Sequence, residues 1–258
     1  MNSVALGPAT FVTIRLSHYC EKARWGLDRA SVAYHEESHV PLLSRFAARR
    51  AAGGTVPVFI RGDLRLTESA DILRHADSTQ PGVLYPLDAQ LRKEVEALEA
   101  RFDQDLGTHV RRWAYTHLLP DQALLRDLWS RDAPRRETLW MPLIVPLASK
   151  LLGRAYKVTP AGAARSSGRI REVFTEVEAR LKDGRRFLAG NRFSAADLTF
   201  AALAAPAVFA PQCRAAMPAL DQVPAAMRGD VMALRATVAG RFALHLYATE
   251  RAFTQSAG

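Results

Sequence analysis

The sequence is poor in cysteine and has no long uninterrupted apolar run. Its two cysteines, Cys20 and Cys213, lie far apart and match neither a disulfide framework nor a metal-binding spacing. The most apolar stretch, 139–152, contains two prolines and Lys150, whereas a membrane span needs about 18 apolar residues. Residues 1–9 lack the basic start and apolar run of a secretory signal. We therefore expect a protein of the reducing cytoplasm, with no metal site and no membrane contact.

Basic residues exceed acidic ones, but they are not concentrated. Lys and Arg total 35 against 26 Asp and Glu, which gives a formal net charge of +9. Most of the excess is scattered arginine, without a dense basic run longer than a pair. Nucleic-acid binding usually shows a focused basic stripe within a recognisable module. We therefore expect no nucleic-acid partner and infer only a general attraction for small anionic ligands.

The pattern of apolar residues divides the chain into two units. Residues 1–80 read as short strands and helices in the order β-α-β-α-β-β-α. A polar linker with proline and glycine begins at residue 78. Residues 88–258 show apolar positions three or four apart and no strand pattern, with long helices expected over 88–117 and 159–182. The fold class is therefore an α/β unit followed by an all-α unit.

The most informative stretch, 17–25, lies where a strand turns into a helix. Residues 11–16 are β-branched, aromatic or apolar apart from one arginine, and 21–30 show a helical pattern. At the helix start, unpaired N–H groups and the helix dipole can steady an anion such as a thiolate. Ser17 could instead serve only as an N-cap. Cys20 could have a lowered pKa there, or could be partly buried.

Two further pairs of residues stand at the starts of later elements. Pro57 opens an apolar strand, where either a cis peptide bond after Val56 or an ordinary trans bond fits. A cis bond would turn the Val56 backbone outward, toward an extended ligand. Ser69 is expected as the N-cap of a helix, with Glu68 beside it. This pair suits the carboxylate and ammonium groups of an α-amino acid, although capping alone would also explain it.

Together these three pieces resemble the glutathione-binding, thioredoxin-like domain of cytosolic glutathione transferases. The resemblance covers residues 11–78 and rests on the order and separation of the pieces. It continues in the helical half, where residues 187–198 resemble the folding motif of that family's helical domain. There Ser194 and Asp197 are placed as a capping box ahead of a buried helix over 198–209. We treat Asp197 as structural.

The resemblance implies a role for each matching residue. Ser17 would contact the sulfur of glutathione, and the backbone of Val56, before a cis Pro57, would pair with its cysteine. Glu68 and Ser69 would hold the γ-glutamyl group. The basic side chain that meets the glycine carboxylate remains open among four candidates: His39, Arg45, Arg49 and Arg50.

The sequence departs from the family pattern at two positions in the first motif. His18 stands where members of the Ser type and the Cys type often have proline, and we interpret it as a solvated turn residue. Cys20 stands where a redox motif of the family would have its second cysteine. Ser17 therefore favours a transferase, while Cys20 keeps thiol chemistry open.

The helical half is long for this family, with an apparent insertion over 133–164. This segment could form a wall or lid over the second-substrate site, contact a membrane or another subunit, or simply extend the core. Trp113 and Tyr115, near the end of the first long helix, are candidates to line an apolar substrate pocket, or are core residues.

The resemblance therefore implies a Ser-type, bacterial-like glutathione transferase with an enlarged helical domain. It implies a glutathione-binding domain over 1–80 and a helical domain over 88–258 that carries the second-substrate site. The enzyme would be a homodimer that conjugates glutathione, its co-substrate, to a small apolar electrophile in detoxification. Two alternatives stay open: a glutathione-dependent thiol-disulfide oxidoreductase that uses Cys20, and a non-catalytic binding module with this fold.

Overall fold

The N-terminal unit of the computed structural model is built on a four-stranded mixed sheet. The structure describes residues 9–50, 53–215 and 217–251. The strand order is β2-β1-β3-β4, in which β1 pairs in parallel with β2 and antiparallel with β3. The elements are β1 (Ala9–Thr13), α1 (His18–Arg29), β2 (Tyr34–Ser38), α2 (Leu43–Arg50), β3 (Val58–Arg61), β4 (Leu64–Leu66) and α3 (Ser69–Thr79). This is the predicted β-α-β-α-β-β-α order.

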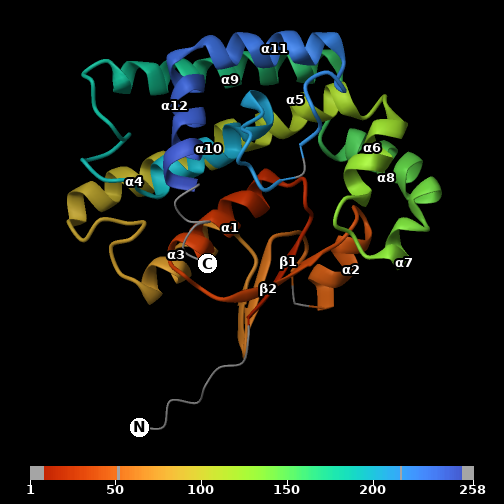
Figure 1. The fold of residues 1–258 in the computed structure, drawn as a ribbon, viewed down its shortest axis with the longest axis horizontal. Coiled ribbons are helices and arrows are strands. Elements are labelled where there is room, and N and C mark those ends of the chain that lie inside the picture. Colours follow the sequence, from red (N-terminus) through yellow and green to blue (C-terminus); the bar gives the residue numbers. More distant parts are fainter. Residues whose placement is uncertain (1–8, 51–52, 216, 252–258) are drawn as a thin grey trace.

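The two faces of the sheet are covered by different helices. Neighbouring residues of a strand point to opposite faces. Phe11 and Phe59 join the large apolar core with α1 and α3, whereas Val12 and Val58 pack with Ala48 of α2. The α1–α3 face lies toward the C-terminal helices, so α1 is placed between the sheet and the helical unit (Figure 1).

Within the described residues, the C-terminal unit is entirely helical. Its elements are α4 (Ala89–Phe102), the π-helical turn η1 (Asp103–Gly107), α5 (Thr108–Leu118), α6 (Gln122–Ser130), α7 (Arg135–Thr138), α8 (Met141–Ala155), α9 (Pro160–Leu181), α10 (Ala195–Val208), α11 (Ala225–Ala236), α12 (Val238–Leu246) and the π-helical turn η2 (Tyr247–Arg251). The long helix predicted over 88–117 exists, but η1 interrupts its regular winding. No helix in the described ranges has the length and apolar character that crossing a bilayer requires.

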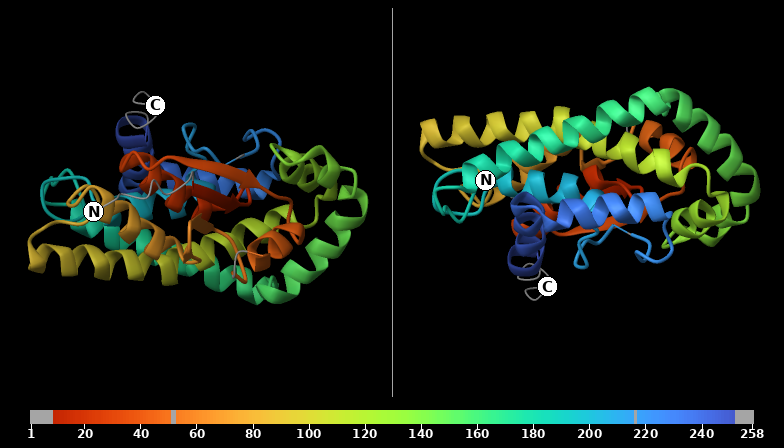
Figure 2. Two further views of the ribbon diagram at one scale, coloured as in Figure 1. Left: turned by 90° about the horizontal axis from the view of Figure 1, so that it is seen from below. Right: turned by 90° about the horizontal axis from the view of Figure 1, so that it is seen from above.

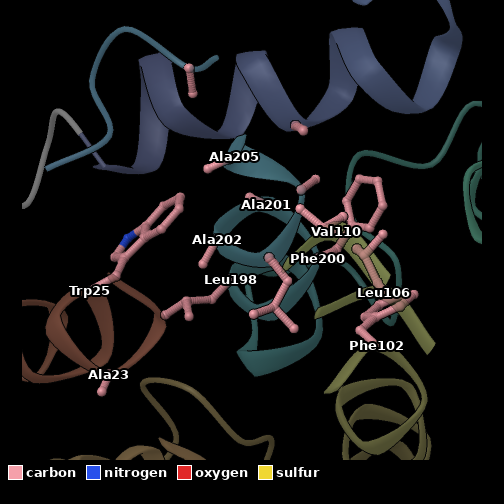
Figure 3. Packing of buried hydrophobic residues seen from close by; sticks show 14 of the residues in the cluster. Ala23, Trp25, Phe102, Leu106, Val110, Leu198, Phe200, Ala201, Ala202 and Ala205 are labelled. Carbon is pink, nitrogen blue, oxygen red and sulfur yellow. The ribbon is translucent and has the colours of Figure 1, made fainter. Parts of the chain in front are cut away.

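Helix α10 forms the centre of the core. Every one of its residues is buried, and Trp25 of α1 and Phe102 of α4 pack around it (Figure 3). The predicted capping box is confirmed, since Ser194 and Asp197 exchange their hydrogen bonds at the helix start. Asp197 also accepts from Leu188 N at 2.8 Å. Burial raises the pKa of Asp197 to about 6, but its carboxylate is occupied by these bonds, which fits a structural role.

The N-terminus of α1 docks on η1 through polar contacts. The buried Lys22 ammonium lies 2.9 Å from Glu99 and 2.6 Å from Asp103. The Tyr19 hydroxyl donates to the Asp103 carbonyl at 2.8 Å, and His18 Nε2 lies 3.0 Å from the Gly107 carbonyl. π-Helical turns are rare and often occur at functional sites. Here the turn joins the two units beside Ser17.

Gly107→Ala should destabilise the protein by about 1–3 kcal/mol, the usual range for overpacking a core. A Cβ at this position would lie 2.7 Å from Cζ of Tyr19 and 3.1 Å from Leu203. An alanine in a helix is otherwise about 1 kcal/mol better than glycine. Urea denaturation would measure the change. Gly168→Ala on α9 is the control, because its Cβ meets nothing within 4 Å, and equal behaviour of the two variants would contradict the close-approach argument.

Segment 133–164 attaches to the N-terminal unit as well as to the core. Helix α8 buries Met141, Ile144, Val145 and Ala148 and curves around one end of the molecule (Figure 2). From α7, Glu137 binds His39 Nδ1 at 2.6 Å and accepts from Val40 N at 2.9 Å. The segment therefore braces the loop before α2. Its outer side stays exposed, with Leu139 at 80% and Leu143 at 66% of full exposure.

Candidate active site

A cavity of about 800 Å³ lies between the two units. Its N-terminal wall brings together the five residues that the sequence assigns to glutathione, although they come from three separate parts of the chain. They are Ser17, Val56, Pro57, Glu68 and Ser69. The opposite wall comes from η1, α5, α6 and α8, with further residues from α4, α10 and α11.

Ser17 is the N-cap of α1 and lines the cavity. Its backbone is extended, and its hydroxyl oxygen accepts a hydrogen bond from Cys20 N at 3.3 Å. A hydroxyl that accepts a hydrogen bond retains a proton of its own that can rotate toward a partner. The N-cap function and a contact with a ligand anion are therefore compatible in one side chain.

The Val56–Pro57 peptide bond is cis, as one of the two sequence alternatives expected. Both residues lie immediately before β3 and line the cavity, with Pro57 buried and Val56 half-buried. Val56 and Pro57 therefore share the lining of one cavity with Ser17.

The start of α3 forms an acidic end of the cavity. The prediction that Ser69 is the N-cap is wrong: Glu68 has the extended N-cap conformation, and Ser69 is the first helical residue. The Glu68 side chain makes no capping hydrogen bond and is exposed, whereas Ser69 is buried. This leaves the Glu68 carboxylate available to a ligand on the cavity side.

Asp103 of η1 is a second acid in the same cavity, and the sequence analysis missed it. Its Oδ2 pairs with Lys22, while its buried Oδ1 has no hydrogen-bond partner among the described residues. Burial raises the pKa of Asp103 despite the opposing charge of Lys22, and the negative charges of Glu99 and, to a smaller extent, Glu68 add to the rise. Two carboxylates that repel each other across a cavity would be stabilised by an ammonium group between them.

Cys20 does not share the cavity with Ser17. Its side chain is fully buried, and burial raises the pKa of the thiol to about 11. The pKa is therefore not lowered overall, because loss of hydration outweighs the contributions that lower it, the hydrogen bond with Ser17 first among them. The thiol stays protonated near neutral pH.

His18 is buried, so its interpretation as a solvated turn residue is wrong. The ring is 5% exposed, and burial, followed by the charge of Arg111, lowers its pKa to about 3. Because the Gly107 carbonyl can only accept, the neutral ring donates from Nε2. His18 therefore fixes α1 to η1 and does not change its charge near neutral pH.

The helical wall of the cavity is mostly aromatic and apolar beyond η1, and Arg111 is the cation that the described part of this wall contributes. It contains Arg111 and Tyr115 of α5, and Leu152 of α8 followed by Tyr156. The expectation that Trp113 lines this pocket is wrong. Its indole is 2% exposed and donates to Asp230 at 3.0 Å, because residues two apart on a helix point to nearly opposite sides.

Of the four basic candidates for the glycine carboxylate, Arg45 lies on the cavity wall. His39 is engaged with Glu137 through Nδ1. Arg49 and Arg50 are exposed in the last turn of α2 and are not among the lining residues. Among the described residues, no group of three or more His, Cys, Asp or Glu side chains is arranged to hold a metal ion.

A thioredoxin-like domain with a cis proline, followed by helices that close a cavity over it, is the architecture of glutathione transferases. The family models agree: residues 11–83 match the glutathione S-transferase N-terminal domain, and residues 160–228 match the glutathione S-transferase C-terminal domain. The chain belongs to the cytosolic glutathione S-transferase superfamily.

Solved structures share this fold at low sequence identity. A glutathione transferase of Phanerochaete chrysosporium is 14% identical with a TM-score of 0.62, and the match covers 95% of this chain and 97% of that chain. A glutathione S-transferase of Ceriporiopsis subvermispora, solved in complex with glutathione, is 16% identical with a TM-score of 0.62 and the same coverage. The theta class enzyme of Xanthomonas axonopodis, with glutathione bound, is 18% identical with a TM-score of 0.51 and coverage of 92% and 96%. No curated protein matches the chain.

Proposed function

We propose that this protein is a Ser-type glutathione transferase that uses Ser17 to activate the thiol of glutathione. The observation that carries the proposal is the single cavity in which Ser17, cis Pro57 and the Glu68–Ser69 pair meet below an apolar helical wall. Two structural relatives named above were solved with glutathione bound.

Glutathione would lie along the N-terminal wall in an extended form. The Val56 backbone would pair with its cysteine, and Glu68 and Ser69 would hold the γ-glutamyl group. Asp103 would bind the γ-glutamyl ammonium together with Glu68. Its Oδ1 has no hydrogen-bond partner among the described residues, and an ammonium group would offset the repulsion between the two carboxylates. Arg45 is the favoured partner of the glycine carboxylate, because it alone of the four candidates lines the cavity.

In the reaction, the Ser17 hydroxyl would donate a hydrogen bond to the glutathione sulfur, and the N-terminus of α1 would add positive potential. Both interactions favour the thiolate, so the thiol releases its proton to solvent near neutral pH. The thiolate then forms a bond from sulfur to the electrophilic carbon of a substrate held against the helical wall, and the leaving group departs with the electron pair of the bond that breaks.

The burial of Cys20 bears on the first alternative. Disulfide exchange needs a thiolate that is accessible to the disulfide of the substrate. Cys20 is fully buried, and its pKa is raised to about 11. We therefore favour the transferase over a thiol-disulfide oxidoreductase. The second alternative, a non-catalytic binding module, differs from a transferase only in that it would bind glutathione without turning over an electrophile. Cytoplasmic location, detoxification and a homodimer stay predictions.

Calorimetric titration with reduced glutathione tests the site. We expect micromolar to millimolar binding, weakened about 100-fold or more in Glu68→Ala/Ser69→Ala, because hydrogen bonds to charged groups contribute about 1.5–3 kcal/mol each. Asp71→Ala is the matched control, since Asp71 is an exposed acid on the same helix that pairs with Arg74. Absence of binding to the unaltered protein, or equal binding by the double variant, would contradict the proposed site.

A further inference from the structure

Arg111 is a cation on the cavity wall that forms no ion pair with any acidic side chain in the described ranges. Its guanidinium lies over the ring of Tyr156 at 4.3 Å and over Tyr19 at 5.4 Å. Its Nε is buried, and among the described residues it has no hydrogen-bond partner. The neighbouring Arg112 differs, since it donates to the Tyr156 carbonyl at 2.7 Å and to Ser166 at 3.0 Å. Arg112 therefore anchors the end of α8 to α5 and α9, whereas the Nε donor of Arg111 is unused within the described residues.

An unused buried donor is costly, and more so when it carries charge. The charge of Arg111 acts on the groups around the cavity, because it opposes the burial that raises the pKa of Tyr115 and helps burial to lower the pKa of His18. Glu68 and Asp103 line the same cavity, yet neither forms an ion pair with Arg111. A ligand that brings its own anion would satisfy the guanidinium.

The surroundings of Arg111 suit a flat aromatic ligand. Tyr115 and Tyr156 stack at 5.5 Å with an interplanar angle of 15°. Apolar side chains complete this part of the cavity: Ala114, Leu118, Trp129, Leu152, Ala155 and Met227. A planar ring can pack on such a wall, with a substituent directed at Arg111.

We propose that the second-substrate compartment selects planar aromatic electrophiles that carry an anionic substituent, with Arg111 binding that substituent. This rests on the proposed transferase function and narrows its substrate class. In an aromatic substitution, the glutathione sulfur forms a bond to a ring carbon, and chloride leaves with the electron pair of the broken bond. The thiol proton goes to solvent, because a guanidinium that is always protonated accepts none. Arg111 contributes binding and charge stabilisation.

Two chloronitrobenzenes that differ in one substituent test the assignment. The anionic probe is 4-chloro-3-nitrobenzoate, and the neutral probe is 1-chloro-2,4-dinitrobenzene. In Arg111→Met we expect kcat/KM for the anionic probe to fall about 10- to 100-fold more than for the neutral probe, the loss of one hydrogen-bonded ion contact. Arg111→Lys should retain part of the preference, since it keeps the charge without the planar fork. Arg126→Met, an exposed position on α6, controls for net charge.

A binding measurement tests the role of Arg111 independently of the proposed transferase activity. 3-Nitrobenzoate has no leaving group, so calorimetry with it, against nitrobenzene, reads the compartment without turnover. Weaker binding of 3-nitrobenzoate alone in Arg111→Met supports the inference, even if neither chloro compound is turned over and the transferase proposal fails. Equal losses for both chloro probes, with unchanged 3-nitrobenzoate binding, would assign Arg111 to the thiolate or to glutathione and overturn the inference.

Discussion

Ser17→Ala should lower kcat/KM for conjugation by about 100- to 1000-fold, the usual loss when one donor to a reacting anion is removed. The affinity for glutathione should change by less than about threefold, because the γ-glutamyl and backbone contacts supply most of the binding energy. The pKa of the bound thiol should rise, since a hydrogen bond to the charged form is lost. Ultraviolet absorbance of the thiolate against pH, measured on the binary complex, would report that shift.

The matched control for Ser17→Ala is Cys20→Ala on the first turn of the same helix. Because Cys20 is buried and its pKa is raised to about 11, its removal should leave conjugation within about threefold. Loss of the Ser17 N-cap costs about 1 kcal/mol, so both variants need circular dichroism to verify folding. The reverse result, in which Cys20→Ala abolishes activity and Ser17→Ala does not, would assign the chemistry to the thiol.

The sequence predicted well the features that local residues determine. The strand-to-helix junction at Ser17 follows from β-branched residues ahead of a helical pattern. The capping box of Ser194 and Asp197 follows from a fixed spacing. The order of elements along the N-terminal unit, and the hairpin of its last two strands, followed from the residue patterns and the turn after Arg61. The family resemblance then placed Glu68 and Val56 in one site.

Most of the helical wall could not be predicted, because it depends on the phase of a long helix. Of the two candidates on that helix, Tyr115 lines the cavity and Trp113 does not. A regular helix turns 100° per residue, and a π-helical turn accommodates one extra residue. The turn at 103–107 therefore rotates everything that follows, including Arg111, Trp113 and Tyr115. The sequence pattern around residue 103 shows no proline or glycine pair that marks this turn. Asp103 was missed for the same reason.

Burial of charged residues was also hidden from the sequence. Lys22 and Arg24 lie off the apolar stripe of their helix in a regular helical pattern, yet both are fully buried. Lys22 pairs with Glu99 and Asp103 of the helical unit, and Arg24 pairs with Glu36 of β2 besides Glu21 on its own helix. Which side of a helix such pairs turn toward the interior depends on the tertiary fold, so the local sequence pattern does not predict it.

Glu21→Gln should lower the free energy of unfolding by about 3–5 kcal/mol, the loss typical of breaking a buried ion pair. The Glu21 carboxylate is fully buried and lies 2.6 Å from Arg24 and 3.0 Å from Arg251. Both guanidinium groups are themselves fully buried. Neutralising Glu21 leaves the two buried arginines with only Glu36 and Asp28. These carboxylates lie at the edge of the cluster and are shared with Arg15 and Arg214, so positive charge is then in excess. Thermal midpoints should fall by about 10 °C in a chain of this size.

Urea denaturation with two comparison variants tests this interpretation of Glu21. Glu172→Gln removes the exposed partner of Arg169 and should cost less than about 1 kcal/mol, as surface ion pairs usually do. Replacing Glu21, Arg24 and Arg251 together by methionine should recover much of the loss, because apolar side chains carry no desolvation cost. A small effect of Glu21→Gln would mean that Glu36 and Asp28 compensate both arginines by themselves. A large effect shows that the cluster couples α1, and therefore the helix start at Ser17, to η2 at the far end of the chain, since Arg251 reaches Glu21 across 230 residues of sequence.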